Sequence, residues 1–145
     1  MNMQFTGRQQ YTALSEAEGH RLVVAVFTTV GQDDPEVLTL FDTGSEWCIL
    51  EPAAASAVGV DLEQRGDYGV CLHSRFGLLA GRLERLPLTL PAQHGAHLIV
   101  EATWFVSPEW PGPRVLGWRG CMERFCFGFD PAGEWFHFGP ATHDS

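Results

Sequence analysis

The residues with the clearest chemical potential in this chain are four in a row: Asp42, Thr43, Gly44 and Ser45. They interrupt the stretch LTLFDTGSEWCIL, residues 38–50, whose other residues are mostly apolar and typical of buried strand. A carboxylate in buried surroundings costs free energy unless it is paired or hydrogen-bonded. Asp42 therefore either begins a surface turn, which Asp, Gly and Ser all favour, or it serves a chemical reaction.

The segments around Asp42 are predicted to be strands. Residues 20–30 are rich in β-branched side chains, the cluster GQDDPE at 31–36 predicts a turn, and residues 37–41 resume the strand pattern. Together they predict an antiparallel hairpin that leads directly into Asp42. We expect a further short strand at residues 47–50.

The rest of the chain adds short elements separated by many turns. We expect a helix at 51–60, two strands within 67–90 around a loop at 73–77, a loop at 91–95, a strand at 96–106, a proline-rich connection at 107–113 and a C-terminal hairpin at 125–139 with its turn at 130–133. The helix is predicted from Pro52, which suits its first position, and from Gly59, which can close it. Seven to nine short strands with one or two short helices predict an all-β domain.

The motif around Asp42 resembles the catalytic motif of the retropepsin-like aspartic proteases. In that family two hydrophobic residues precede Asp-Thr-Gly and Ser or Ala follows it, on a loop after a β-strand, and LFDTGS fits this pattern. A second signature of the family, two apolar residues and a glycine before a short helix, is similar to Val115, Leu116 and Gly117. The resemblance covers about residues 20–130 and implies a retropepsin-like closed β-barrel, with one lobe per chain.

The family also carries a β-hairpin flap between its two signatures, and this flap closes over substrate. Residues 71–81 lie where such a flap is expected, with Arg75, Phe76 and Gly77 near its tip. A solvent-facing hairpin tip that never contacts substrate is the alternative for these residues, with about equal weight.

The resemblance implies an aspartic endopeptidase, an enzyme that needs two carboxylates sharing one proton. Like charges at that distance cannot both ionise, so the pair titrates as a unit, activates a water molecule and protonates the leaving amine. The sequence holds one Asp-Thr-Gly, and Asp130 in FDPAG lacks the hydroxyl and glycine that follow Asp42. The second carboxylate must then come from another copy of the chain, so the mechanism implies a homodimer and a polypeptide substrate.

Supporting roles around Asp42 also follow from the resemblance. It implies that Thr43 braces the carboxylate pair across the dimer axis, that Gly44 allows a tight turn, and that Ser45 hydrogen-bonds the outer oxygen of Asp42. Trp118 follows the second signature where many viral members have arginine, and the C-terminal hairpin extends beyond the compact viral pattern. These departures leave open which strands form the dimer contact.

Charge and composition disfavour several other classes of protein. The formal net charge is −9 and every cation is an arginine, which argues against binding to nucleic acid or to a membrane surface through a basic face. Without lysine the chain has no P-loop and no Schiff-base chemistry. No apolar stretch approaches the length of a membrane span and the first twenty residues do not resemble a signal peptide, so we expect a cytoplasmic protein. The four cysteines, Cys48, Cys71, Cys121 and Cys126, are then expected to stay reduced.

The length of 145 residues predicts a single domain. We place this domain at residues 20–138, between an N-terminal arm at 1–19 and a C-terminal tail at 139–145. The arm is open to being a flexible segment or a strand, because its residues are polar and mixed.

Other functions remain open on the sequence alone. The same fold could act without catalysis, as a dimerisation or peptide-binding module. His94 and His97 lie in one loop, but no carboxylate or cysteine accompanies them at ligand spacing, so we expect no metal, and we expect no other cofactor. Cysteine–histidine catalysis stays possible in principle, although no pattern in the sequence selects it.

Overall fold

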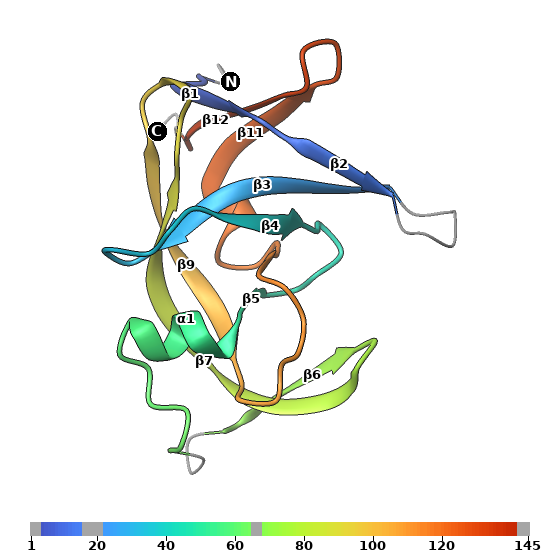
Figure 1. Ribbon diagram of the computed structural model, residues 1–145, viewed down its shortest axis with the longest axis vertical. Coiled ribbons are helices and arrows are strands. Elements are labelled where there is room, and N and C mark those ends of the chain that lie inside the picture. The colour runs from blue at the N-terminus through green and yellow to red at the C-terminus, as the bar shows by residue number, and fades with distance from the viewer. Residues whose placement is uncertain (1–3, 16–21, 65–67, 142–145) are drawn as a thin grey trace.

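The computed structural model describes residues 4–15, 22–64 and 68–141, and β-strands dominate them (Figure 1). The strands are β1 (Gly7–Gln10), β2 (Thr12–Ser15), β3 (Leu22–Val30), β4 (Val37–Phe41), β5 (Cys48–Leu50), β6 (Val70–Ser74), β7 (Gly77–Leu90), β8 (His94–Gly95), β9 (Leu98–Val106), β10 (Val115–Leu116), β11 (Phe125–Asp130) and β12 (Trp135–Pro140). The helices given for these ranges are α1 (Pro52–Ala57) and the 3₁₀ helix η2 (Met122–Arg124). The expected all-β class is confirmed, with more strands than the seven to nine predicted.

Two sheets share the strands. The smaller sheet has the order β11-β12-β1-β8, and the larger has the order β2-β3-β4-β10-β5-β9-β7-β6. An additional pairing places Thr29 and Val30 of β3 opposite Thr89 and Leu88 of β7. Six strands, β3, β4, β10, β5, β9 and β7, therefore follow one another in a closed ring of pairings. Figure 1 shows the smaller sheet at the top and the hairpin of β6 and β7 at the opposite end.

The predicted hairpin before Asp42 is confirmed. Strands β3 and β4 pair antiparallel, with Ala25 opposite Leu40, and Ala25 is fully buried. The connection between them is fixed by Asp34, whose Oδ2 accepts the N–H of Val30 at 2.9 Å. Because one face of this hairpin packs in the core, its register is set by burial, and the chain enters Asp42 in a defined direction.

The predicted helix is confirmed as α1. Pro52 begins it, as expected from the fixed backbone angle of proline, and Glu51 precedes it. Gly59 follows with a φ of 93°, and its N–H donates to the carbonyl oxygen of Ser56 at 3.1 Å, which closes the last turn. Within the described ranges no helix is long and apolar enough to cross a membrane.

Aromatic side chains from both sheets fill the core. The fully buried ones are Trp104, Phe105, Phe136 and Phe138. Phe41, the last residue of β4, has its ring centroid 5.0 Å from that of Phe127 and 5.1 Å from that of Phe129, both edge-on. Burying such a ring stabilises by about 2 kcal/mol, more than the ~1 kcal/mol of one backbone hydrogen bond. The rings therefore fix the end of β4 against the C-terminal hairpin.

Strand β1 lies in the segment for which the sequence left an arm or a strand open. It pairs with β12 and β8, and the side chain of Gln9 joins it to the larger sheet. The Gln9 Nε2 donates to the carbonyl oxygens of Phe27 and Pro91, both at 3.0 Å, and its Oε1 accepts the Phe27 N–H at 2.7 Å. Gln9 is 2% exposed, so these bonds are made away from water. The polar strand β1 is held by its neighbours rather than by an apolar pattern of its own.

Three boundaries differ from the sequence prediction in ways that strand pairing explains. The stretch at 91–95, expected to be a loop, contains β8, which pairs with β1. The turn of the C-terminal hairpin lies at residues 131–134, one residue later than predicted, and Glu134 adopts a φ of 55° there. Strand β12 extends to Pro140, one residue beyond the predicted end of the hairpin. In each case the boundary is set by pairing with a neighbouring strand, which cannot be predicted from local composition.

Substitution of Gly7 tests whether β1 is integral to the fold. A methyl group at Gly7 would lie 2.2 Å from the Ala96 carbonyl oxygen and 2.8 Å from the Phe138 ring, so Gly7→Ala must displace β1 or its neighbours. We expect the free energy of unfolding to fall by about 1–3 kcal/mol in urea titration. Gly69→Ala is the matched control, because nothing lies within 4 Å of a methyl group there. Equal stability of the two variants would show that β1 contributes little.

Candidate active site

The backbone of Asp42 is fixed by the second predicted signature. Strand β10 pairs in parallel with β4, which places Val115 opposite Leu40 and Leu116 opposite Phe41. Directly beyond this pairing the Asp42 N–H donates to the carbonyl oxygen of Leu116 at 3.0 Å. The two signatures, far apart in the sequence, therefore lie side by side.

Residues 42–45 form a tight turn that points the carboxylate outward. The Ser45 N–H donates to the Asp42 carbonyl oxygen at 3.1 Å, and the Gly44 N–H donates to Asp42 Oδ1 at 2.9 Å. Asp42, Thr43 and Gly44 are all exposed in the single chain. In one copy of the chain the Asp42 side chain is therefore exposed, because the apolar strands end on either side of the turn. Residues 42–45 thus form a surface turn, and this conformation leaves the carboxylate accessible for chemistry.

The hydroxyl group of Ser45 has a different partner from the one expected. Its Oγ donates to the carbonyl oxygen of Trp47 at 2.7 Å, so its proton is directed toward the next strand rather than toward Asp42. A serine hydroxyl has a single proton to donate, which makes the two bonds alternatives. In the single chain, Ser45 therefore braces the turn rather than the carboxylate.

The chain after Leu116 packs tightly against this loop. A methyl group at Gly117 would lie 2.2 Å from the Trp47 carbonyl oxygen, so only glycine fits there. The Trp118 N–H donates to the Ser45 carbonyl oxygen at 2.9 Å. Trp118, which departs from the viral pattern, thus holds the loop through its backbone, while its side chain is largely exposed. The short helix expected after the second signature is η2.

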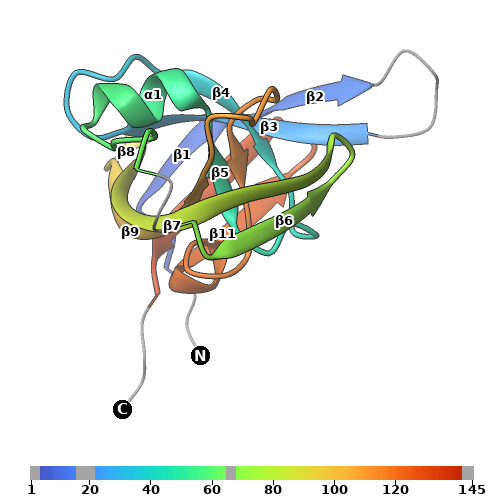
Figure 2. The same cartoon turned by 90° about the horizontal axis from the view of Figure 1, so that it is seen from below.

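A cavity of about 770 Å³ opens over the Asp42 loop. It is lined by Val23, Val24, Leu40, Phe41, Asp42, Thr43, Gly44, Ser45, Ile49, Leu72, His73, Ser74, Arg75, Trp110, Pro113, Val115, Phe127 and Phe129. Its walls come from the β3–β4 hairpin, the β6–β7 hairpin, the connection after β9, and β11. In Figures 1 and 2 the end of β2, the start of β3 and the tip of the β6–β7 hairpin project to the same side of the molecule.

The β6–β7 hairpin turns at the residues predicted for a flap tip. Arg75 and Phe76 form the turn and Gly77 begins β7 with a φ of 101°, a backbone conformation that favours glycine. Arg75 lines the cavity, and its guanidinium carbon lies 5.0 Å from the centroid of the Phe76 ring. The Phe76 ring packs edge-on against Trp110, with centroids 5.3 Å apart.

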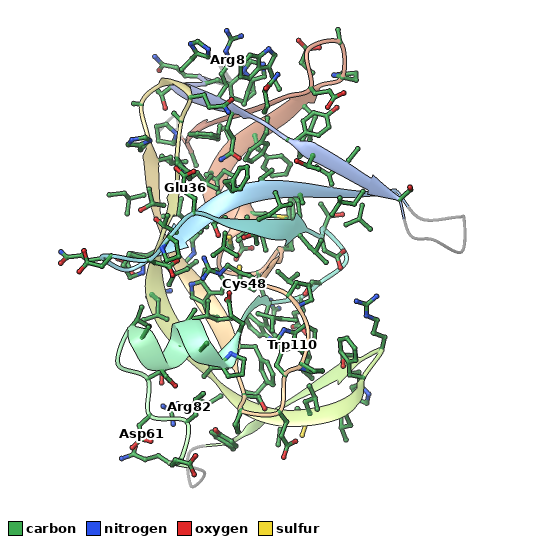
Figure 3. All side chains as sticks on the ribbon, viewed as in Figure 1. Arg8, Glu36, Cys48, Asp61, Arg82 and Trp110 are labelled. Atoms are coloured by element: carbon green, nitrogen blue, oxygen red, sulfur yellow. The ribbon has the colours of Figure 1, made fainter. Side chains whose placement is uncertain are left out.

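Trp110 is a cavity residue that the sequence did not single out. Figure 3 shows it between β5 and the β6–β7 hairpin, and its indole Nε1 donates to the Pro113 carbonyl oxygen at 2.9 Å. A methyl group at Gly112 would lie 2.6 Å from the Trp110 ring and 3.0 Å from the Phe76 ring, so the glycine lets the hairpin tip approach. A tryptophan between prolines in SPEWPGP was the one available signal, since such a connection has few conformations.

The structure also shows the surroundings of one cysteine and of the two histidines considered above. Hydrogen bonding to Cys48 and burial raise the pKa of the Cys121 thiol far above its usual range, so this cysteine stays protonated and is a poor nucleophile. The His97 Nδ1 accepts the Ala92 N–H at 2.8 Å, and the His94 ring packs on Trp135 with centroids 5.4 Å apart. These contacts give both histidines partners within the fold.

Replacing Ser45 distinguishes its two possible partners. Loss of the bond to the Trp47 carbonyl oxygen in Ser45→Ala should lower the free energy of unfolding by about 1 kcal/mol. Since a carbonyl group does not titrate, we expect the same loss at about pH 4 and about pH 7 in urea titrations. A bond to the Asp42 carboxylate would instead give a loss that is present at the higher pH and shrinks as the carboxylate is protonated. Ser56→Ala, on the exposed surface of α1, is the control and should change stability little.

Comparisons with known proteins bear on the fold. The sequence matches no protein-family model and no curated protein. The structure is similar to the crystal structure of a retropepsin-like aspartic protease from Rickettsia conorii, with a TM-score of 0.59 over 90% of this chain and 98% of that chain. The two sequences are 17% identical over the match. The chain therefore has the retropepsin-like fold that its two signatures predicted.

Proposed function

We propose that the protein is an aspartic endopeptidase that acts as a homodimer, with Asp42 of each copy forming the catalytic pair. The observation that carries the proposal is the position of Asp42. Its backbone N–H is bound to Leu116 and its carboxylate faces a cavity, within a retropepsin-like fold. A fixed backbone with an exposed carboxylate is what a group that reacts with substrate requires.

The need for a second copy follows from the composition of the cavity wall. Among the described residues that line the cavity, Asp42 is the only one with a carboxylate. Two carboxylates must share a proton for the reaction, so one chain holds half of the site. The exposed surface of Thr43 and Gly44 beside Asp42 leaves room for the same loop of a second copy across a twofold axis.

In the dimer each residue of the loop has a distinct role. One Asp42 is ionised and takes a proton from water, which attacks the peptide carbonyl carbon. The other Asp42 is protonated and donates a hydrogen bond to the developing oxyanion, and a proton then passes to the leaving amine. Thr43 braces the pair across the axis, and Gly44 supplies the N–H that holds Asp42 Oδ1.

The substrate is an extended polypeptide with apolar side chains near the scissile bond. The cavity offers apolar surface from Val23, Leu40, Ile49, Leu72 and Val115 around the Asp42 loop. Main-chain groups of an extended peptide can pair with exposed backbone beside such a cleft, while its side chains enter apolar pockets. The β6–β7 hairpin, with Arg75, Phe76 and Gly77 at its tip, acts as the flap that covers the bound peptide.

Replacement of the catalytic carboxylate is the direct test. We expect the protein to cleave unfolded casein between about pH 4 and pH 7, with inhibition by pepstatin, and Asp42→Asn to lower kcat/KM by at least about 1000-fold. The control is Asp130→Asn, an exposed residue at the end of β11 whose carboxylate accepts the Ala132 N–H at 3.0 Å and lies outside the cavity. Equal cleavage rates for wild type and Asp42→Asn would rule out the proposed mechanism.

Mixing wild type with Asp42→Asn tests whether the pair is shared between chains. After exchange of subunits in a one-to-one mixture, activity per wild-type chain should fall by about half, because mixed dimers carry one carboxylate. Unchanged activity per wild-type chain would mean that each chain works alone. If neither protein cleaves but both bind an extended peptide, the chain is a peptide-binding module, and sedimentation velocity would show whether it is still a dimer.

A further inference from the structure

A buried ionic cluster surrounds Arg114, the residue that immediately precedes the second signature. The side chain of Arg114 is fully buried. Its Nε donates to Glu51 Oε1 at 2.9 Å, and its Nη2 lies 3.4 Å from Glu51 Oε2, so the two groups meet side by side. Its Nη1 donates to Asp34 Oδ2 at 3.0 Å and to Thr28 Oγ1 at 3.2 Å. A guanidinium without these partners would be costly at such a place.

The cluster joins three segments that are separate in sequence. Thr28 belongs to β3, Asp34 to the connection between β3 and β4, and Glu51 to the residue before α1. The Asp34 carboxylate also accepts the Val30 N–H, and the hydroxyl groups of Thr28 and Thr39 are 2.7 Å apart. One cation therefore ties the β3–β4 hairpin and the start of α1 to the beginning of β10.

Backbone bonds connect the same residue to Asp42. The Arg114 carbonyl oxygen accepts the Leu40 N–H at 3.0 Å, and two residues later the Leu116 carbonyl oxygen accepts the Asp42 N–H at 3.0 Å. Strand β10 consists of Val115 and Leu116 alone, so it has few ladder bonds of its own. A displacement of Arg114 would therefore be transmitted along a very short strand to the carbonyl group that holds Asp42.

We propose that Arg114 is a positioning residue for Asp42, and that it sets the place of the catalytic loop through β10. This inference rests on the proposed function. Arg114 is not among the residues that line the cavity, so it acts through Leu116 and not on substrate. Two carboxylates can share a proton only over a short distance, and a misplacement of about 1 Å can lower a rate by about 100-fold. Arg114 supplies the rigidity that this distance requires.

The test replaces Arg114 by lysine, which keeps the charge but cannot reach Glu51 and Asp34 with the same geometry. In Arg114→Lys we expect kcat for casein-derived peptides to fall about 100-fold, with KM changed less than about threefold, because substrate contacts are intact. The pH profile of kcat should also shift, since the spacing of the carboxylates sets how they share a proton. Arg82→Met is the matched control: it removes an arginine that pairs with Glu84 at 2.8 Å, outside the cavity.

A second readout does not depend on activity. Hydrogen exchange at the Asp42 amide, which donates to Leu116, should be faster in Arg114→Lys than in wild type, while exchange in β12 stays unchanged.

If wild type cleaves no polypeptide, the proposed function fails, and the exchange rate still decides the role of Arg114. Should Arg114→Lys fail to fold, Glu51→Gln weakens the same cluster at a partly exposed residue and takes its place. Unchanged exchange at Asp42, or activity lost only in proportion to unfolded protein, would overturn the proposal.

Discussion

Where β10 pairs in parallel with β4, two segments from distant parts of the chain meet, and the Asp42 N–H donates to the Leu116 carbonyl oxygen at 3.0 Å. The candidate site depends on this contact because it joins the first residue of the turn, which carries the carboxylate, to the buried strand β10. The close approach of Gly117 to the Trp47 carbonyl oxygen is possible only when β10 is in place. Pairing of the two strands is therefore what converts a sequence motif into a fixed carboxylate.

The exposure of the Asp42 side chain in the single chain bears on the proposed function. A carboxylate at the surface of one chain is solvated, so the single chain bears little of the desolvation cost that a buried charge carries. In the proposed dimer that cost would arise when a second copy covers the loop, where the second carboxylate and the shared proton would offset it. Folding of one chain thus fixes the direction of the Asp42 carboxylate. Assembly of the dimer proposed above would add the second carboxylate that the reaction needs.

The sequence predicts those parts of the fold that depend on local pattern. The β3–β4 hairpin and α1 follow from β-branched residues and from Pro52. The family resemblance identified the two signatures, but their contact through β4 and β10 comes from the structure. Strands β1 and β8 do not follow from local pattern, because their residues are polar and their pairing partners lie far along the chain. The partner of the Ser45 hydroxyl was also beyond prediction, since both Asp42 and the Trp47 carbonyl oxygen are close to it in sequence. Arginine is usually a solvated surface residue, so the sequence did not indicate that Arg114 is buried. Only the fold brings Asp34 and Glu51 to it.

A buried ionic cluster is a poor source of stability, because desolvation of the charges offsets most of their attraction. The cluster around Arg114 instead constrains the register in which β10 pairs with its neighbours. Val115 and Leu116 are both buried and apolar, and they pack into two different core clusters on opposite faces of the sheet. A strand that is apolar on both faces has no alternation to fix its position, so hydrophobic burial would tolerate a slip by one residue. Such a slip would take the Arg114 guanidinium away from Glu51 and Asp34 and leave charges buried without partners. The cluster therefore selects the one register in which the Leu116 carbonyl oxygen meets the N–H of Asp42.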